Sequence, residues 1–149
     1  YRGESLTLAY KDEKFFVPKN IFIIGMMNTA DRSLAMIDYA LRRRFSFFDM
    51  KPGFNSTGFQ EYMHKFNNPH FEALVNAIVE LNKKITADDS LGEGFEIGHS
   101  YFCGQTSVTD AWLKSVVKYD IIPMLQEYWF DNKSEVKISG DRLLAVLND

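Results

Sequence analysis

The pattern of apolar and polar positions changes character near residue 53. Before that point most of the chain alternates or runs continuously apolar, as strands do, with one stretch of helical spacing from Leu34. After it the apolar residues recur at helical spacing throughout. Residues 5–10 alternate, residues 11–14 are charged, and residues 15–17 are apolar up to Pro18. This order predicts a β-hairpin that ends at the proline.

The most apolar run of the first part is residues 21–27, Ile-Phe-Ile-Ile-Gly-Met-Met. A strand that is apolar on both faces is typical of the middle of a parallel sheet covered by helices. Residues 28–33 contain no apolar side chain larger than alanine, and helical spacing begins at Leu34. We therefore expect a strand-to-helix junction at residues 28–33 and a second short strand at residues 45–49.

The second part of the chain predicts helices only. A possible capping box at Thr57 begins the first, and Asn68 followed by Pro69 is typical of the cap and first turn of a long second helix. Pro123 is expected to kink or split a later helix. The expected elements are a helix at 57–66, a helix at 69–85, an ordered loop with aromatic anchors at 87–105, a helix from 109 or 110 interrupted before 124–130, a polar connection at 131–135 and a short helix at 142–147.

Composition and charge narrow the class of protein. The net charge of −3 over 149 residues does not favour tight binding of nucleic acid or of an anionic membrane. A single cysteine excludes an internal disulfide and a metal-binding cysteine pair, and the three histidines have no close partners, so we expect no metal site and a cytoplasmic protein. No apolar run is long enough for a membrane span.

Asn28 is the first polar side chain after the predicted buried strand. In an open α/β sheet, ligands bind beyond the carboxyl ends of the strands. An asparagine there can donate to a terminal phosphate oxygen and accept from an attacking water, which suits phosphoryl transfer. It can equally cap the next helix, and spacing alone leaves both roles open.

Four of the six arginines fall within thirteen residues, at Arg32, Arg42, Arg43 and Arg44. Asp31 and Arg32 can form an ordinary loop ion pair or act at a nucleotide. Three adjacent guanidinium groups repel one another, so a phosphate from a neighbouring subunit is a natural partner. The triple arginine also fits a solvated helix end, where cations suit the helix dipole, and spacing alone favours that reading. Contact with nucleic acid is a third, weaker option.

Two other motifs carry less weight. Gly92, Gly94 and Gly98 have the spacing GxGxxxG without a preceding strand, which is not a phosphate-binding loop. His99 and Cys103 suggest a nucleophile pair, but Cys103 among aromatic residues is expected to be a small buried hydrophobe. The role of His99, either hydrogen-bonded in the interior or near a nucleotide, stays open.

Read as whole segments, the sequence resembles the McrB family of AAA+ GTPases, which belong to methylcytosine-specific restriction systems. Four segments carry the resemblance over almost the whole chain, and Met-Asn-Thr-Ala-Asp-Arg within the first is the most specific. They are residues 17–33, residues 38–45, residues 94–102 and residues 120–128.

The resemblance implies an α/β fold: the C-terminal remnant of a AAA+ parallel-sheet core at residues 1–53, followed by an all-α helical lid at 54–149. It implies that Asn28 is the sensor-1 residue near the γ-phosphate and that Asp31 belongs to the same motif. Arg43 and Arg44, with Arg42 a less certain member, match the arginine-finger region that acts on the neighbouring subunit's nucleotide.

The resemblance also implies that Arg32 lies at the subunit interface and that His99 falls within the lid, where it could approach the nucleotide. Arg142 is the only arginine after Arg44, so no sensor-2 arginine is assigned.

The 149 residues contain neither GxxxxGK[ST] nor an apolar run ending in Asp-Glu, so both nucleotide-binding motifs are expected upstream of Tyr1. By itself this fragment is then expected to hold no GTP, ATP or Mg²⁺ and to be inactive. The full protein would be a homo-oligomeric ring that hydrolyses GTP, or ATP, and drives a partner endonuclease similar to McrC. An N-terminal domain outside this chain would bind the modified DNA. The alternatives are a AAA+ ATPase of another helix-2-insert family and a non-catalytic helical interaction module.

Overall fold

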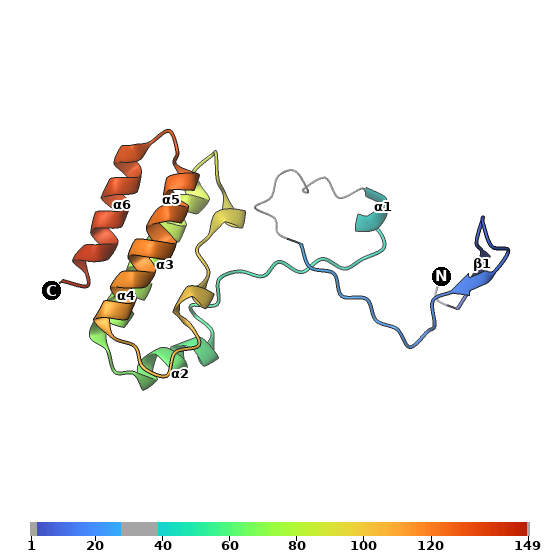
Figure 1. Cartoon of the computed structure of the whole chain (residues 1–149), viewed down its shortest axis with the longest axis horizontal. Coiled ribbons are helices and arrows are strands. Elements are labelled where there is room, and N and C mark those ends of the chain that lie inside the picture. Colours follow the sequence, from blue (N-terminus) through green and yellow to red (C-terminus); the bar gives the residue numbers. More distant parts are fainter. Residues whose placement is uncertain (1–2, 28–38, 149) are drawn as a thin grey trace.

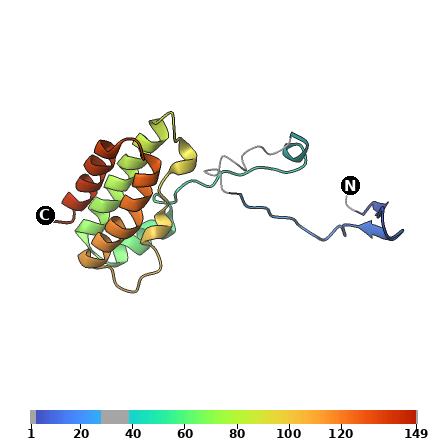
Figure 2. The same ribbon diagram turned by 45° about the horizontal axis from the view of Figure 1, so that its top comes forward.

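The computed structural model describes residues 3–27 and 39–148. Figure 1 shows a bundle of helices formed by residues from 57 onward, with an extended N-terminal segment that reaches away from it and carries a small hairpin. Figure 2, turned by 45°, shows the same separation. The described part of the chain is thus mostly helical, with one two-stranded sheet.

The N-terminal hairpin is confirmed. Strands β1 (Ser5–Thr7) and β2 (Lys14–Phe16) pair antiparallel, with Leu6 opposite Phe15. Asp12 has a φ of 52° in the connecting turn, a conformation that aspartate tolerates better than most residues.

The two other predicted strands are not formed. Residues 21–27 belong to no strand, and Ile24 and Met26 are 90% and 96% exposed. Residues 45–49 likewise belong to no strand. A strand with two apolar faces needs neighbours at its edges and helices on its faces, and β1 and β2 are the only paired strands among the described residues. Of the helix expected from Leu34, the described part is α1 (Tyr39–Arg42).

Helix α2 (Thr57–Lys65) begins as expected, but with a different cap. The hydroxyl of Ser56 accepts a hydrogen bond from the Phe59 amide, so Ser56 and not Thr57 is the N-cap. Gln60 does not complete a capping box, because its side chain donates to the carbonyl of Phe54.

Helix α3 (Pro69–Ala87) is confirmed, with Asn68 as its cap. The Asn68 side chain accepts from the amides of His70 and Phe71, and Pro69 occupies the first turn, where it costs no hydrogen bond. The apolar face of this helix forms the centre of the core. Its buried residues are Phe71, Leu74, Val75, Ala77, Ile78, Leu81, Asn82 and Ile85.

Pro123 does not break the chain into separate helices. Helix α4 (Asp110–Val116), capped by Thr109, runs into a π-helical turn η3 (Val117–Ile121) and then into α5 (Ile122–Tyr128). Residues 116, 117, 121 and 122 all keep right-handed helical angles. The wider turn thus carries the chain past a residue that has no N–H to donate and whose ring crowds the preceding turn.

The last helix is longer than predicted. Helix α6 (Lys133–Ala145) begins where a polar connection was expected. Its inward positions are Val136, Ser139, Gly140 and Leu143, which have helical spacing but include two small residues that an apolar pattern does not count. Gly140 is small because Ile122 lies against it: an added Cβ would be 3.1 Å from the Ile122 Cδ1.

The loop between α3 and α4 is ordered, as expected. It contains the short helices η1 (Glu93–Phe95) and η2 (His99–Phe102). Phe102 is fully buried in the core, and the ring of Phe95 packs edge-on against Tyr128, with centroids 5.1 Å apart.

Candidate functional site

The triple arginine lies at the end of α1 and just after it. Arg42, Arg43 and Arg44 are all exposed, and the amide of Arg43 donates to the carbonyl of Tyr39. The guanidinium of Arg42 lies 5.8 Å from the ring centroid of Phe47, a cation–π distance. Among the residues that the structure describes, no carboxylate lies within ion-pair distance of the three guanidinium groups.

Asn28, Asp31 and Arg32 lie outside the described residues. Their assignment to the nucleotide or to a subunit boundary stays a prediction.

His99 is hydrogen-bonded within the chain. Its Nδ1 accepts from the backbone N–H of Gly53 over 2.9 Å, so in this arrangement the ring proton is on Nε2. The half-buried ring packs edge-on against Phe54 and Phe59, with centroids 6.1 and 5.6 Å away. These contacts are those of an interior hydrogen-bonded histidine. A contact between His99 and a nucleotide stays a prediction.

Cys103 is exposed, so the expectation of a buried hydrophobe is wrong. The backbone at Cys103 is extended and Phe102 points into the core, which turns the next side chain outward. Partial burial nevertheless raises the pKa of its thiol. The sulfur contacts the carbonyl oxygen of His99 at 3.4 Å and not the imidazole, so the two residues form no nucleophile–base pair.

Asn82 is a buried polar residue that the sequence pattern did not single out. Its side chain accepts from the N–H of Ile97 at 2.7 Å and donates to the carbonyl of the same residue at 2.9 Å. Asn82 is 5% exposed, and Ile97 1%. An asparagine on the apolar face of a predicted helix was the signal in the sequence, because a buried side-chain amide needs hydrogen-bond partners from another segment.

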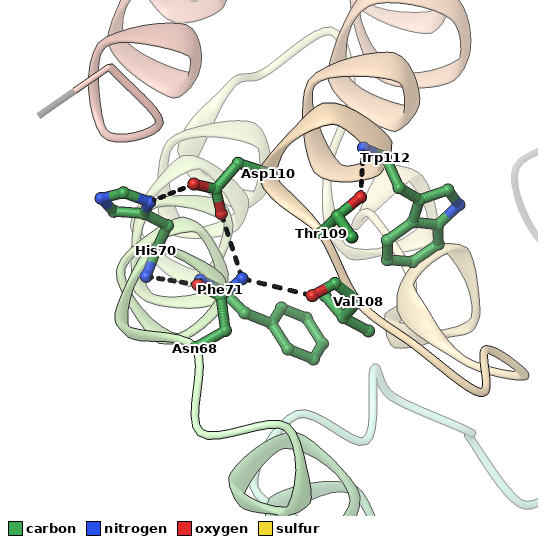
Figure 3. Close-up of polar contacts among 7 residues, drawn as sticks. All are labelled: Asn68, His70, Phe71, Val108, Thr109, Asp110 and Trp112. Carbon is green, nitrogen blue, oxygen red and sulfur yellow. Dashed lines mark hydrogen bonds and ion pairs between the residues drawn. The ribbon is translucent and has the colours of Figure 1, made fainter.

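A second polar group joins the starts of α3 and α4 (Figure 3). The Asn68 amide donates to the carbonyl of Val108 and to Oδ1 of Asp110, and Nδ1 of His70 lies 2.8 Å from Oδ2 of Asp110. Hydrogen bonds from Asn68, and then from His70, lower the pKa of the Asp110 carboxyl. Because these hydrogen bonds join the residues at the starts of the two helices, this group fixes α4 on α3.

Within residues 3–27 and 39–148, no group of three histidine, cysteine or acidic side chains could hold a metal ion. No helix in the same ranges is long and apolar enough to cross a membrane.

Comparison with known proteins identifies the helical part of the chain. Residues 73–137 match the family model described as the α-helical lid domain of McrB. These residues run from α3 through the first turns of α6 and contain the whole of the η1–η2 loop.

A curated relative extends the similarity beyond the lid. The chain is 50% identical over 156 aligned residues to a protein of Escherichia coli strain K12 described as the type IV methyl-directed restriction enzyme EcoKMcrB subunit. The alignment covers 97% of this chain and 34% of that relative, so the chain spans about a third of the relative's length. The family model matches the helices of the lid, and the alignment with the relative also includes the arginine segment. The chain therefore belongs to the McrB family of restriction-system subunits.

Proposed function

We propose that this chain is part of a AAA+ nucleoside triphosphatase that hydrolyses GTP and drives a DNA restriction complex. In this proposal Arg43 and Arg44 contact the nucleotide of the neighbouring subunit in a ring, and Arg42 assists them. Asn28 positions the attacking water at the subunit's own nucleotide. The helices from residue 54 onward form the lid of that site.

The exposure of the arginine cluster carries the proposal. Guanidinium groups are always charged and present several donors that match phosphate oxygens. In the described part of the chain Arg42, Arg43 and Arg44 stand side by side without a carboxylate partner, and a phosphate is an anion that their guanidinium groups fit. The relative of 50% identity is a subunit of a methyl-directed restriction enzyme, which supports the restriction context.

The remaining parts of the nucleotide site would come from outside the 149 residues. No GxxxxGK[ST] motif is present to cradle the phosphates and Mg²⁺, so this chain alone is proposed to be inactive. The arginines fit a terminal phosphate group, since they stabilise the charge on its oxygens during transfer. A partner endonuclease and an N-terminal DNA-binding domain complete the proposed system.

Mixing subunits tests the trans role of the arginines. Full-length protein carrying both Arg43→Ala and Arg44→Ala is added in increasing proportion to wild type, and GTP turnover is measured. We expect turnover to fall as the variant replaces wild type, because an arginine finger contributes about 10³-fold or more to phosphoryl transfer. Lys65→Ala removes an exposed cation from the end of α2 and serves as the matched control. Unchanged turnover with the double variant would leave the arginines as a solvated helix end.

The nucleotide is tested separately. Competition between GTP and ATP for the full-length protein is expected to favour GTP. A preference for ATP would place the protein with AAA+ ATPases of another helix-2-insert family.

A further inference from the structure

Residues 51–54 are attached to the lid, although they precede its first helix. Gly53 donates its amide proton to His99, and the side chain of Phe54 is 3% exposed, edge-on to Phe59 with centroids 5.5 Å apart. Lys51 pairs with Glu93 at 3.0 Å. Any movement of the lid therefore carries residue 53 with it.

Residues 46–50 lack such attachments. All five side chains are exposed, and within the described residues no hydrogen bond holds their backbone. The ring of Phe47 lies at a cation–π distance from Arg42, which connects this segment with the arginine cluster. Arg44 and Gly53 are thus joined by a short connection that is held at the lid end by His99.

The Gly53–His99 contact requires a residue without a side chain at position 53 and a ring with an acceptor at position 99. An added Cβ on Gly53 would lie 3.1 Å from Cε1 of His99 and 3.2 Å from Nε2, so the ring lies directly on the glycine backbone. Nδ1 of His99 accepts from the amide of the half-buried Gly53, while the same ring packs against Phe54 and Phe59. His99 thus combines ring packing with the one acceptor that faces Gly53 in the described structure.

We propose that His99 is a positioning residue for the arginine cluster. By fixing residue 53 to the lid, it makes the lid of each subunit set the position of the Arg43 and Arg44 side chains that act on the neighbouring nucleotide. The inference rests on the proposed trans role of these arginines. It assigns His99 an effect in the adjacent site and not in its own subunit's site.

Complementation between full-length variants separates the two sites. Asn28→Ala impairs a subunit's own site and leaves its arginines intact. The double variant Arg43→Ala with Arg44→Ala keeps the subunit's own Asn28 but removes the arginines that act on the neighbouring site. When these two reference variants are mixed, GTP hydrolysis should recover, because each supplies what the other lacks. If this reference pair recovers nothing, the proposed trans arrangement is wrong and the inference falls with it.

His99→Phe is the test variant, since it keeps a ring against Phe54 and Phe59 but removes the acceptor. Alone, it should lower kcat about ten- to hundredfold, the effect of misplacing a catalytic group by about 1 Å, with the KM for GTP unchanged. A mixture of His99→Phe and Asn28→Ala subunits should recover turnover, because each supplies what the other lacks. A mixture of His99→Phe with the double arginine variant should not, because both are impaired in the arginine cluster. Suppose that the reference pair recovers turnover but His99→Phe recovers it only with the double arginine variant. His99 would then act in its own subunit's site, and this inference would be wrong while the proposed function stands.

Two further variants control for folding and for the hydrogen bond. His99→Asn places an amide oxygen where Nδ1 lies and should retain most of the wild-type turnover. If His99→Asn has a folded lid by circular dichroism but loses turnover, the acceptor is not what positions the arginines. This comparison decides the question even where His99→Phe fails to fold. Lys83→Ala removes an exposed ion pair with Glu80 on α3, which plays no part in holding residues 51–54, and should leave turnover within about twofold, since such pairs are weak.

Discussion

The indole Nε1 of Trp129 donates a hydrogen bond to Oδ2 of Asp88 over 2.8 Å. Asp88 ends α3 and Trp129 ends α5, so this contact fixes the two helices to each other at the same end of the bundle. The adjacent start of α6 is fixed by the pair between Lys84 and Glu135. The three helices are thereby joined through side chains that lie far apart in the sequence.

Removing the Trp129 side chain should destabilise the lid strongly. The residue is 4% exposed, and truncation of a buried aromatic side chain costs about 3–5 kcal/mol of unfolding free energy. We expect Trp129→Ala to show this loss in urea denaturation and Trp129→Phe to show a smaller one. The matched control is Trp112→Ala, because Trp112 is only half-buried. Equal losses at the two positions would contradict the packing described here.

Gly140 and Gly58 should respond in opposite directions to substitution. A larger side chain such as leucine at position 140 must displace Ile122, and overpacking of this kind costs about 1–3 kcal/mol or more. At position 58 on α2 nothing lies within 4 Å of an added Cβ, so Gly58→Ala should gain roughly 0.5–1 kcal/mol from helix propensity. Thermal melting of the two variants measures both effects. A stable Gly140→Leu protein would mean that α6 does not pack on Ile122.

Asn82 should be necessary for the order of the loop that leads to His99. Asn82→Leu leaves the buried N–H and C=O of Ile97 without partners, at about 1–3 kcal/mol for each unsatisfied group. We expect amide hydrogen exchange to increase at residues 93–102 as well as a loss of global stability. Asn76→Leu, at another asparagine of α3 that is exposed, is the control. Unchanged exchange in the loop would refute the role of Asn82.

The lid should lose stability in acid through particular carboxyls. Hydrogen bonds from Asn68 and His70 lower the pKa of Asp110, and a hydrogen bond from Lys84, followed by one from Ser139, lowers the pKa of Glu135. A carboxyl whose pKa is lower in the folded state contributes stability above its unfolded pKa, and that stability is lost as the pH falls through the folded value. Stability should thus hold from neutral pH down to about pH 5 and then decline.

The variant that tests this is Asp110→Asn. It should lower stability at neutral pH and make the acid decline shallower, as measured by urea midpoints across the pH range. Asp89→Asn, at an exposed aspartate, should leave the shape of the curve unchanged. If the stability of Asp110→Asn falls as steeply in acid as that of the wild type, Asp110 does not contribute to the acid sensitivity.

The sequence by itself determined the helical lid well. Apolar residues on one face of residues 69–87, with Asn68 and Pro69 before them, specify α3 through local capping and periodicity, which need no distant partner. The hairpin and the ordered loop follow equally from local signals. Local signals failed at α6, because Ser139 and Gly140 are buried there and the close approach of Ile122 to Gly140 cannot be read from the sequence pattern.

Tertiary structure alone decided the rest. Whether residues 21–27 form a buried strand depends on neighbouring strands. The one sheet among the described residues is β1–β2, so an apolar pattern was not sufficient. The sequence left His99 between two roles, and only the fold brought its Nδ1 to the amide of Gly53, 46 positions earlier. Residue types and spacing set which helices can form, whereas contacts between distant segments set which polar groups meet, since a hydrogen bond requires both partners at one place.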